Sequence, residues 1–519
     1  MLEKLAMWGE ARSQCASAIL VGVLVFIICM IRLVWLVILP DIELIKFVPD
    51  DAFYYLILAK NFALEQRWTF DGYAPASGFH LLWAYLLAGV YFVFPHIDWQ
   101  SMFIVAGVAG SIAFSAAAYF VTVIVTRLAG GAAIYGVFFV FFGSASIIQP
   151  ALMMETPFAM FFAAALFFIV FCSGPLVGGR LMLLGASIGI MGMLSRSDFG
   201  LLPLVMFCVA AFVVRDSGKA RLALSALLGA IIGLIIVVAH TYWLSGELAP
   251  ASAQMKNHWA QVDGMSFKPG YEILLALVLP FLKAGQWEWQ AQFGTLLLLA
   301  CLGVALYVSL IHHNRKDILG VYVSAGVVIV GYLLFYRHNG ALQVWYAGAF
   351  LVPFSILTGI SLSVAGRRWP VPVACMVFGV AAYSLSLSMK APWQWQSSML
   401  RGGIYLKEHP VDGQVGAWNA GIISYFSQQP IVNLDGLVND DVLEYAKTGR
   451  LSDYVALRRI DYIMDFPIML SGFFSESHGY GDGKLLACMS QEYVIPASTA
   501  AGEFGGKLTL YRIRGGCLR

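Results

Sequence analysis

Carboxylates and cations stand at a few places in a chain that is otherwise strongly apolar. The adjacent acids Asp50 and Asp51 follow the first long apolar run, and Glu155 stands in a short polar link further on. The cations Arg196 and Lys256 occupy two later links. A carboxylate within hydrogen-bond reach of a substrate can act as a general base, and arginine and lysine can hold phosphate oxygens. These residue types indicate proton transfer beside a phosphate group.

Each of these side chains also has a purely structural interpretation. The paired acids can begin an interfacial helix, because carboxylates are favoured at its positive N-terminal end. Glu155 can cap the helix that follows it, and Arg196 can pair with Asp198, two residues further on. Lys256 can extend to lipid headgroups. Carboxylates at the edge of a bilayer are usually functional, so both interpretations stay open.

The composition is that of a polytopic membrane protein. Of 519 residues, 60% are hydrophobic and 12% are charged, about half of the roughly 25% charged residues of soluble proteins. Surface that meets lipid does not need charge. The formal net charge is +2, so there is no basic surplus for binding nucleic acid. We therefore set aside nucleic-acid binding and a simple soluble enzyme.

The apolar runs predict about eleven transmembrane helices. Two shorter apolar runs, 79–94 and 271–282, are interpreted as interfacial or re-entrant segments. Alternate links, beginning with the N-terminus, carry the Lys and Arg residues, which predicts a cytoplasmic N-terminus and, with an odd number of spans, an extracytoplasmic C-terminus. The predicted spans are residues 17–39, 101–126, 131–149, 157–174, 181–194, 199–214, 220–243, 291–311, 318–335, 346–364 and 370–389.

The composition changes after the last predicted span. Short apolar runs alternate with an amphipathic stretch at 442–454, which predicts a small α/β domain over residues 390–519, separate from a transmembrane domain over 1–389. Cys488 and Cys517 lie in polar sequence, where they can form a disulfide if the segment is extracytoplasmic. The apolar runs expected to be strands are 414–418, 430–434, 461–464 and 507–513.

The large first outer loop, residues 40–100, resembles that of a known superfamily. The chain is similar in this loop to the GT-C integral-membrane glycosyltransferases, above all to bacterial relatives of arabinofuranosyltransferases and protein O-mannosyltransferases. The resemblance continues in later links. These contain an acid in the second outer loop, an Arg-x-Asp segment, and a Gly-x-x-x-Pro-x-Ser segment followed by lysine. The matching segments of the first loop are Asp50-Asp51, Tyr54-Tyr55-Leu56, Ala59, Asn61, Thr69-Phe70-Asp71-Gly72, Ser77-Gly78-Phe79-His80 and Trp83.

The resemblance implies an activity. It predicts an inverting glycosyltransferase that moves a sugar from a polyprenyl-phosphate carrier to an acceptor hydroxyl, on the outer face of the bacterial cytoplasmic (inner) membrane. The acceptor is a glycan, a lipid or a protein, and membrane lipid is the other expected partner. No metal ligand and no cofactor is required, although two neighbouring acids leave a divalent metal open.

The resemblance also implies residue roles. Asp50 is expected to be the general base, facing Glu155, and Asp51 is expected to orient the loop or to assist. Residues expected to bind the donor phosphate are Arg196, Lys256 and Arg337. Residues expected near the acceptor or the sugar are His80, Asp198, His258, Tyr346 and Asp435.

Two alternatives use the same lipid-linked substrates. A flippase or transporter would need charges at several depths of the membrane, whereas the charges here gather at one face. A polymerase of surface glycans cannot be separated from a transferase by these residues. The sequence contains no P-loop or Rossmann glycine pattern, which argues against a nucleotide-sugar donor on the inner face.

Overall fold

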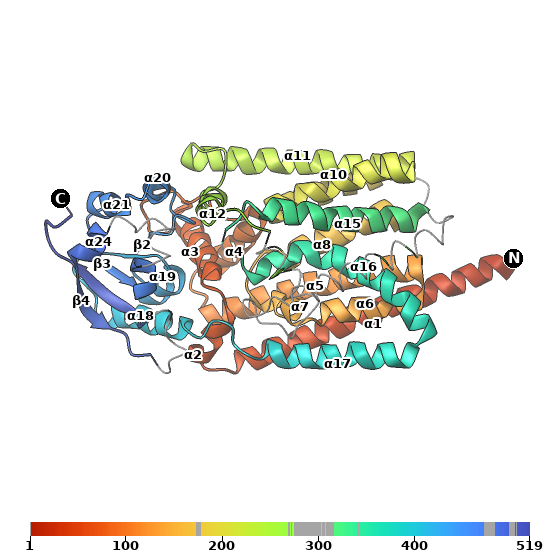
Figure 1. The fold of residues 1–519 in the computed structure, drawn as a ribbon, viewed down its shortest axis with the longest axis horizontal. Helices are drawn as coiled ribbons and strands as arrows, with labels where there is room; N and C mark the ends of the chain where they lie inside the picture. The colour runs from red at the N-terminus through yellow and green to blue at the C-terminus, as the bar shows by residue number, and fades with distance from the viewer. Residues whose placement is uncertain are drawn as a thin grey trace.

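The protein consists of a helical bundle and a sheet-containing unit at one end of it (Figure 1). The computed structural model describes residues 2–172, 178–267, 316–340, 342–471, 483–497 and 506–518, with positions 270, 272, 273, 303, 307 and 504. Helix α1 begins at the end of the bundle opposite the sheet unit (Figure 1). The other bundle-side helices are α2 (Asp41–Leu44), α3 (Asp50–Glu65), α4 (Leu81–Val93), α5 (Trp99–Ala129), α6 (Ile134–Phe141), α7 (Ser144–Ile147), α8 (Thr156–Cys172), α9 (Gly179–Ser195), α10 (Leu201–Cys208), α11 (Ser217–Ser245), α12 (Ala251–Val262), α15 (Lys316–Tyr336), α16 (Ala347–Arg368) and α17 (Pro370–Ser388), after α1 (Leu2–Val37).

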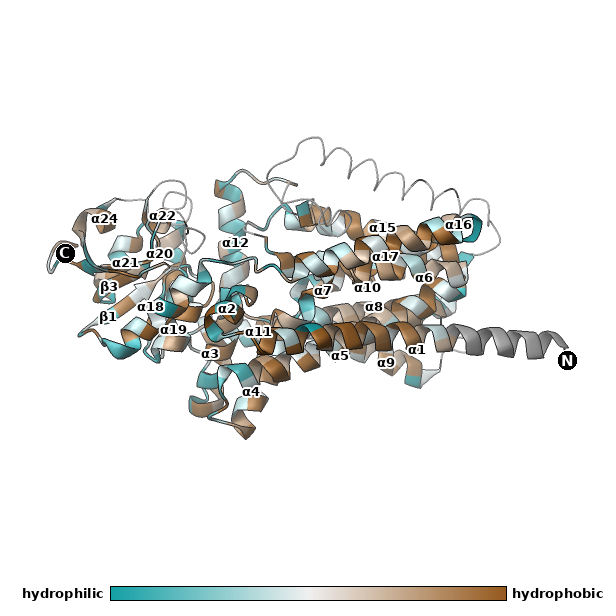
Figure 2. Ribbon diagram, turned by 90° about the horizontal axis from the view of Figure 1, so that it is seen from below, coloured by the Kyte–Doolittle hydropathy of each residue, from teal (hydrophilic) through white to brown (hydrophobic). Residues whose placement is uncertain are grey.

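The chain is a multi-pass membrane protein. Within the described residues, seven helices are long and apolar enough to cross a membrane, and α4, α8 and α9 are shorter apolar helices. Figure 2 shows hydrophobic colouring along α1 and hydrophilic colouring on α12. Ten of the predicted spans coincide with helical segments, while most of 291–311 and most of 271–282 lie outside the described residues. The total of eleven therefore stays a prediction.

One predicted span is not a straight helix. Residues predicted to cross as 131–149 form two helical pieces, Gly131–Phe141 and Ser144–Ala151, bent by 69°. Gly143 lies between them with an extended backbone, φ −61° and ψ 149°, which interrupts the helical hydrogen bonds. Apolar composition alone did not reveal this bend.

The basic links lie together at the end where α1 begins (Figure 1). Arg127 donates to the carbonyl of Cys172 over 2.6 Å, Arg367 donates to the carbonyl of Ala129, and Lys219 pairs with Asp317. These contacts join links that are far apart in sequence. The opposite end of the bundle faces the sheet unit (Figure 1).

The C-terminal unit, defined as residues 396–518, contains a five-stranded mixed sheet of order β2-β1-β3-β5-β4. Strands β2, β1 and β3 are parallel, and β5 is antiparallel to β3 and β4. The four predicted strands are present, and β4 is additional because its mostly exposed residues gave no apolar run. The elements are α18 (Gln396–Glu408), β1 (Gln414–Ala417), α19 (Gly421–Ser427), β2 (Ile431–Asn433), α20 (Leu443–Lys447), α21 (Leu451–Leu457), β3 (Ile460–Asp465), α22 (Pro467–Leu470), α24 (Lys484–Cys488), β4 (Met489–Val494) and β5 (Thr509–Ile513).

Two local features of the unit bear on the sequence predictions. The amphipathic stretch forms the two short helices α20 and α21, which are separated by a turn where Gly449 has a φ of +66°. Cys488 and Cys517 form a disulfide with their Cα atoms 5.6 Å apart. The disulfide fastens the chain end to the start of β4.

Helices α3, α4 and α12 lie between the bundle and the C-terminal unit (Figure 1). Phe53 of α3 packs its ring against Tyr425 and Phe426 of the unit, with centroids 5.4 and 5.7 Å away. At Gly78 the two parts approach so closely that a Cβ would lie 1.6 Å from the carbonyl oxygen of Leu437. The sequence therefore needs glycine at position 78.

This close approach gives a test of the docking. Gly78→Ala must displace the backbone of the C-terminal unit, and overpacking of this kind costs about 1–3 kcal/mol. We expect a lower thermal midpoint in detergent and faster limited proteolysis at the junction. Gly89→Ala is the matched control, because a Cβ there meets nothing within 4 Å. Equal stability of the two variants would contradict a close contact between Gly78 and Leu437.

Candidate active site

Helix α3 presents the two adjacent acids to different surroundings. Successive residues of an α-helix point about 100° apart. The carboxylate of Asp50 accepts hydrogen bonds from the backbone N–H groups of Gly421 and Ile422, at 3.2 and 2.6 Å, where α19 begins. Asp51 lines a cavity together with Tyr55, one turn further along α3. Asp50 thus connects α3 to the C-terminal unit, whereas Asp51 faces the cavity.

Two adjoining cavities lie at the end of the bundle beside the C-terminal unit. The α3 cavity is lined by Asp51, Glu155 and residues of α3. The α15 cavity is lined by Arg196, Asp198 and residues of α15. Both cavities share one wall, so a molecule in one lies directly beside a molecule in the other. The shared wall consists of Phe79, His80, Ser252, Lys256 and Tyr346.

A buried ion network lies where the cavities meet. Arg196 is 3% exposed and Glu155 is 1% exposed, and Arg196 Nη1 donates to Glu155 Oε1 over 2.7 Å. Arg196 Nη2 donates to Asp198 Oδ2 over 2.9 Å, and the Tyr336 hydroxyl donates to the same oxygen. His80 Nε2 lies 3.5 Å from Glu155 Oε1. The guanidinium is therefore already balanced by two carboxylates.

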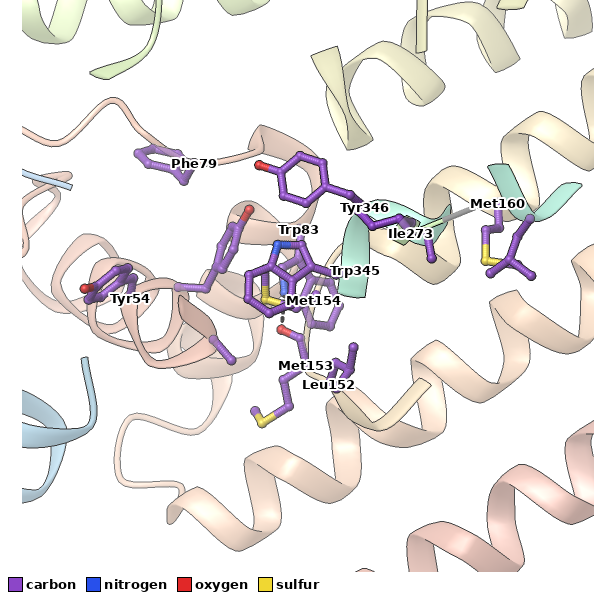
Figure 3. Close-up of a cluster of buried hydrophobic side chains, with 14 of the residues drawn as sticks. Tyr54, Phe79, Trp83, Leu152, Met153, Met154, Met160, Ile273, Trp345 and Tyr346 are labelled. Carbon is purple, nitrogen blue, oxygen red and sulfur yellow. Dashed lines mark hydrogen bonds between the residues drawn. The ribbon is translucent and has the colours of Figure 1, made fainter. Parts of the chain in front are cut away.

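The link that carries Glu155 is fixed by aromatic packing. Trp83 donates its indole N–H to the carbonyl oxygen of Met153 over 2.9 Å, and Figure 3 shows this bond beside Trp345. Met153 has a left-handed backbone with φ 56°. This tight turn precedes Glu155 and directs its carboxylate toward Arg196.

Lys256 is placed differently from Arg196. Its ammonium donates to the Tyr346 hydroxyl over 2.6 Å, and it lies 4.8 Å from the centroid of the same ring. Arg196 also lies 4.8 Å from that centroid. Within the described residues, the salt bridges within 4.0 Å do not include Lys256. Lys256 therefore has N–H donors left for a ligand.

Both adjacent carboxylates have raised pKa values. Burial raises the pKa of Asp51, the charge of Lys256 lowers it, and Glu155 raises it further. A carboxylate with a raised pKa is a stronger base than an ordinary one. Burial also raises the pKa of Asp50 to about 7, although the N–H of Ile422 lowers it. The hydrogen bonds of Asp50 hold it against α19.

The C-terminal unit reaches this site through Asp435. The Tyr54 hydroxyl donates to Asp435 Oδ2 over 2.8 Å, and the backbone N–H of Leu437 donates to Asp435 Oδ1 over 2.7 Å. Burial raises the pKa of Asp435 to about 8, although the N–H of Leu437 lowers it. Asp435 therefore positions Tyr54, which itself lines the α3 cavity.

Four of the expected site residues are not among the residues that line the two cavities, namely Asp50, Asp435, Arg337 and His258. The guanidinium of Arg337 stacks on the ring of Phe267, 5.4 Å from its centroid. Tyr336, the last residue of α15, lines the α15 cavity instead. Tyr336 could have been predicted as a site residue because it is an aromatic residue at the end of a span. The prediction chose its neighbour Arg337 because that residue is charged. Ser252, one turn before Lys256, is the serine of the Gly-x-x-x-Pro-x-Ser segment, but it was given no role because it carries no charge.

Among the described residues, no group of three or more His, Cys, Asp or Glu side chains is arranged to hold a metal ion. Glu155 and Asp198 are engaged with Arg196. Asp50 and Asp435 accept hydrogen bonds. The sequence expectation that a divalent ion can take part stays a prediction.

Solved structures with a similar architecture include ArnT and archaeal oligosaccharyltransferases. ArnT from Cupriavidus metallidurans, solved bound to undecaprenyl phosphate, superposes with a TM-score of 0.57 at 12% sequence identity, covering 96% of this chain and 98% of ArnT. The oligosaccharyltransferase of Archaeoglobus fulgidus, solved with Zn and sulfate, has a TM-score of 0.51 at 12% identity, covering 84% of this chain and 67% of that chain.

The chain has the GT-C fold. This confirms the helical GT-C architecture that the resemblance implied, while the number of spans and the side of the membrane on which the C-terminal unit lies stay predictions. A third similar structure is archaeal AglB from Archaeoglobus fulgidus, in complex with an inhibitory peptide and a dolichol-phosphate, with a TM-score of 0.51, 12% identity and coverage of 86% of this chain and 69% of that chain. Residues 389–510 match the family model described as "Domain of unknown function (DUF8728)". No curated protein matches the sequence.

The ion network gives a second test. Glu155→Ala removes one carboxylate from a buried guanidinium, and breaking a buried pair costs about 3–5 kcal/mol, with the lower end expected because Asp198 remains. We expect a clear fall in the thermal midpoint of the detergent-solubilised protein. The control is Glu65→Ala at the exposed end of α3, which should change stability by less than about 0.5 kcal/mol. Equal midpoints for Glu155→Ala and the unaltered protein would leave Glu155 without a structural role.

Proposed function

We propose that this GT-C protein is an inverting glycosyltransferase that moves a sugar from a polyprenyl-phosphate carrier to an acceptor hydroxyl. One observation carries the proposal: a cavity lined by the carboxylate of Asp51 adjoins a second cavity, and the ammonium of Lys256 lines both. The undecaprenyl phosphate bound by ArnT and the dolichol-phosphate bound by AglB support a carrier of this class.

The α15 cavity suits the lipid phosphate. Its lining combines Lys256 and Arg196 with the apolar side chains of Met193, Val237 and Phe335. A phosphate there can take N–H donors from Lys256, while the isoprenoid chain lies against the apolar residues. Because Arg196 is held by Glu155 and Asp198, we assign it to fixing the phosphate's surroundings and Lys256 to direct binding.

The α3 cavity suits the acceptor. In the proposed step, Asp51 takes the proton of the acceptor hydroxyl as its oxygen bonds to the anomeric carbon. The bond between that carbon and the phosphate oxygen breaks, and the electron pair leaves with the lipid phosphate. Lys256 stabilises the negative charge that develops there. Attack from one cavity on a sugar whose leaving group lies in the other inverts the anomeric centre.

This assignment differs from the role expected for Asp50. The sequence resemblance selected the first of the two acids as base, whereas the geometry favours Asp51. Both carboxylate oxygens of Asp50 accept hydrogen bonds from the N–H groups at the start of α19. Asp50 is therefore poorly placed to accept a proton from a substrate hydroxyl. We therefore propose Asp50 as a positioning residue that anchors α3.

The proposed orientation places the site and the C-terminal unit outside the cytoplasm, at the bacterial inner membrane. The basic links at the opposite end of the bundle support this, because positive links favour the cytoplasm. The disulfide between Cys488 and Cys517 suits an oxidising compartment. The site charges gather at one end of the bundle, which favours a transferase over a transporter; a polymerase would use the same chemistry.

Binding of the carrier tests the phosphate assignment. Lys256→Ala should weaken binding of undecaprenyl phosphate by about 1.5–3 kcal/mol, the range for hydrogen bonds to charged groups. Binding is measured by microscale thermophoresis on the detergent-solubilised protein. Arg337→Ala, a cation removed outside the cavities, should leave the affinity unchanged. The reverse pattern would move the phosphate site to Arg337.

Turnover tests the base. Purified protein is incubated with a panel of undecaprenyl-phosphate-linked monosaccharides and membranes of the producing cells as the source of acceptor, and released undecaprenyl phosphate is quantified. Asp51→Asn should lower the rate by about 10²–10⁴-fold, the contribution of a general base, and should still bind undecaprenyl phosphate. Asp50→Asn should be milder and accompanied by reduced stability. An inactive, stable Asp50→Asn with an active Asp51→Asn would restore the first assignment.

A further inference from the structure

The segment Asp435–Asp440 of the C-terminal unit is inserted into the site. The backbone N–H of Asp440 donates to the carbonyl of Pro75 over 3.1 Å, and the N–H of Ser77 donates to Asp440 Oδ1 over 3.2 Å. Gly436 has a φ of +76°, and a Cβ there would lie 2.6 Å from Met255 of α12. The segment is thus seated between the first loop and α12.

Two apolar residues of this segment face the α3 cavity. Leu437 and Val438 line it, at 8% and 2% exposure. The reaction step proposed above does not use them. They stand in a cavity whose other walls include the Asp51 carboxylate, the Lys256 ammonium and the Tyr346 hydroxyl. A small apolar surface beside a reacting carboxylate has room for the carbon-bound hydrogens of a substrate.

We propose that Leu437 and Val438 determine which acceptor enters the α3 cavity. The inference rests on the proposed transferase function and deepens it. The acceptor part that enters is a hydroxyl-bearing carbon skeleton of the carbohydrate or polyol class. Its hydroxyl faces Asp51 and its C–H face packs against Leu437 and Val438.

The C-terminal unit thereby contributes to acceptor selection. Residues 389–510 match a domain whose function is unknown, and the segment that it contributes forms the acceptor wall. The donor contacts, in contrast, come from the bundle and from α12. Exchange of the wall residues therefore changes the acceptor without touching the carrier site.

The test compares two nucleophiles of different size. Val438→Phe fills space that the acceptor needs, whereas water stays small enough to attack the sugar and release free sugar with undecaprenyl phosphate. We expect transfer to membrane acceptors to fall by about 10-fold or more, since single-group changes in a pocket discriminate by about 10–200-fold. Donor hydrolysis without membranes, and binding of undecaprenyl phosphate, should stay within about twofold by the same reasoning.

A matched pair of smaller changes keeps the test independent of folding. Val438→Ala should alter the ratio of transfer to hydrolysis, while Val432→Ala, equally buried in β2 but outside the cavities, should leave that ratio unchanged. Unchanged transfer in Val438→Phe, or an equal fall of transfer and hydrolysis in both Val438 variants, overturns the inference. Failure of the unaltered protein to release undecaprenyl phosphate from any donor would instead overturn the proposed function.

Discussion

The burial of Arg196 between two carboxylates is the interaction on which the site depends. A guanidinium that is 3% exposed requires charged partners, because an unpaired buried charge is very costly. Glu155 and Asp198 supply them from separate links, and Tyr336 adds a hydroxyl from the end of α15. The network fixes the ends of α8, α9 and α15 relative to one another, and Lys256 keeps N–H donors with which to meet a ligand.

Helical geometry places the two adjacent acids in different surroundings. A rotation of about 100° per residue turns Asp50 toward α19 and Asp51 toward the cavity. The same helix docks the C-terminal unit and presents the proposed base, so the unit and the base are placed together. Asp435 extends this coupling by holding Tyr54, a cavity residue, with a carboxylate from the unit. The site is complete with the unit in place.

Much of the architecture could be predicted from composition and periodicity. Lipid requires long apolar helices, and buried sheet strands appear as short apolar runs, so most spans and the strands β1, β2, β3 and β5 could be predicted. Features that do not require an apolar run could not be predicted in this way. The exposed strand β4 has no apolar run, and the bend at Gly143 needs only one extended residue inside an apolar stretch.

For the site, the sequence by itself determined which charges the membrane-embedded chain carries and that they fall in links at one end of the helices. It could not decide where each side chain points. Adjacent acids cannot be distinguished by residue type alone. Arg337 is the more obvious phosphate ligand by its charge, but Tyr336 is the residue that lines the α15 cavity. Leu437 and Val438 look like ordinary core residues. Their roles depend on contacts between residues hundreds of positions apart, such as Gly78 against Leu437, and such contacts exist only once the C-terminal unit has docked on α3.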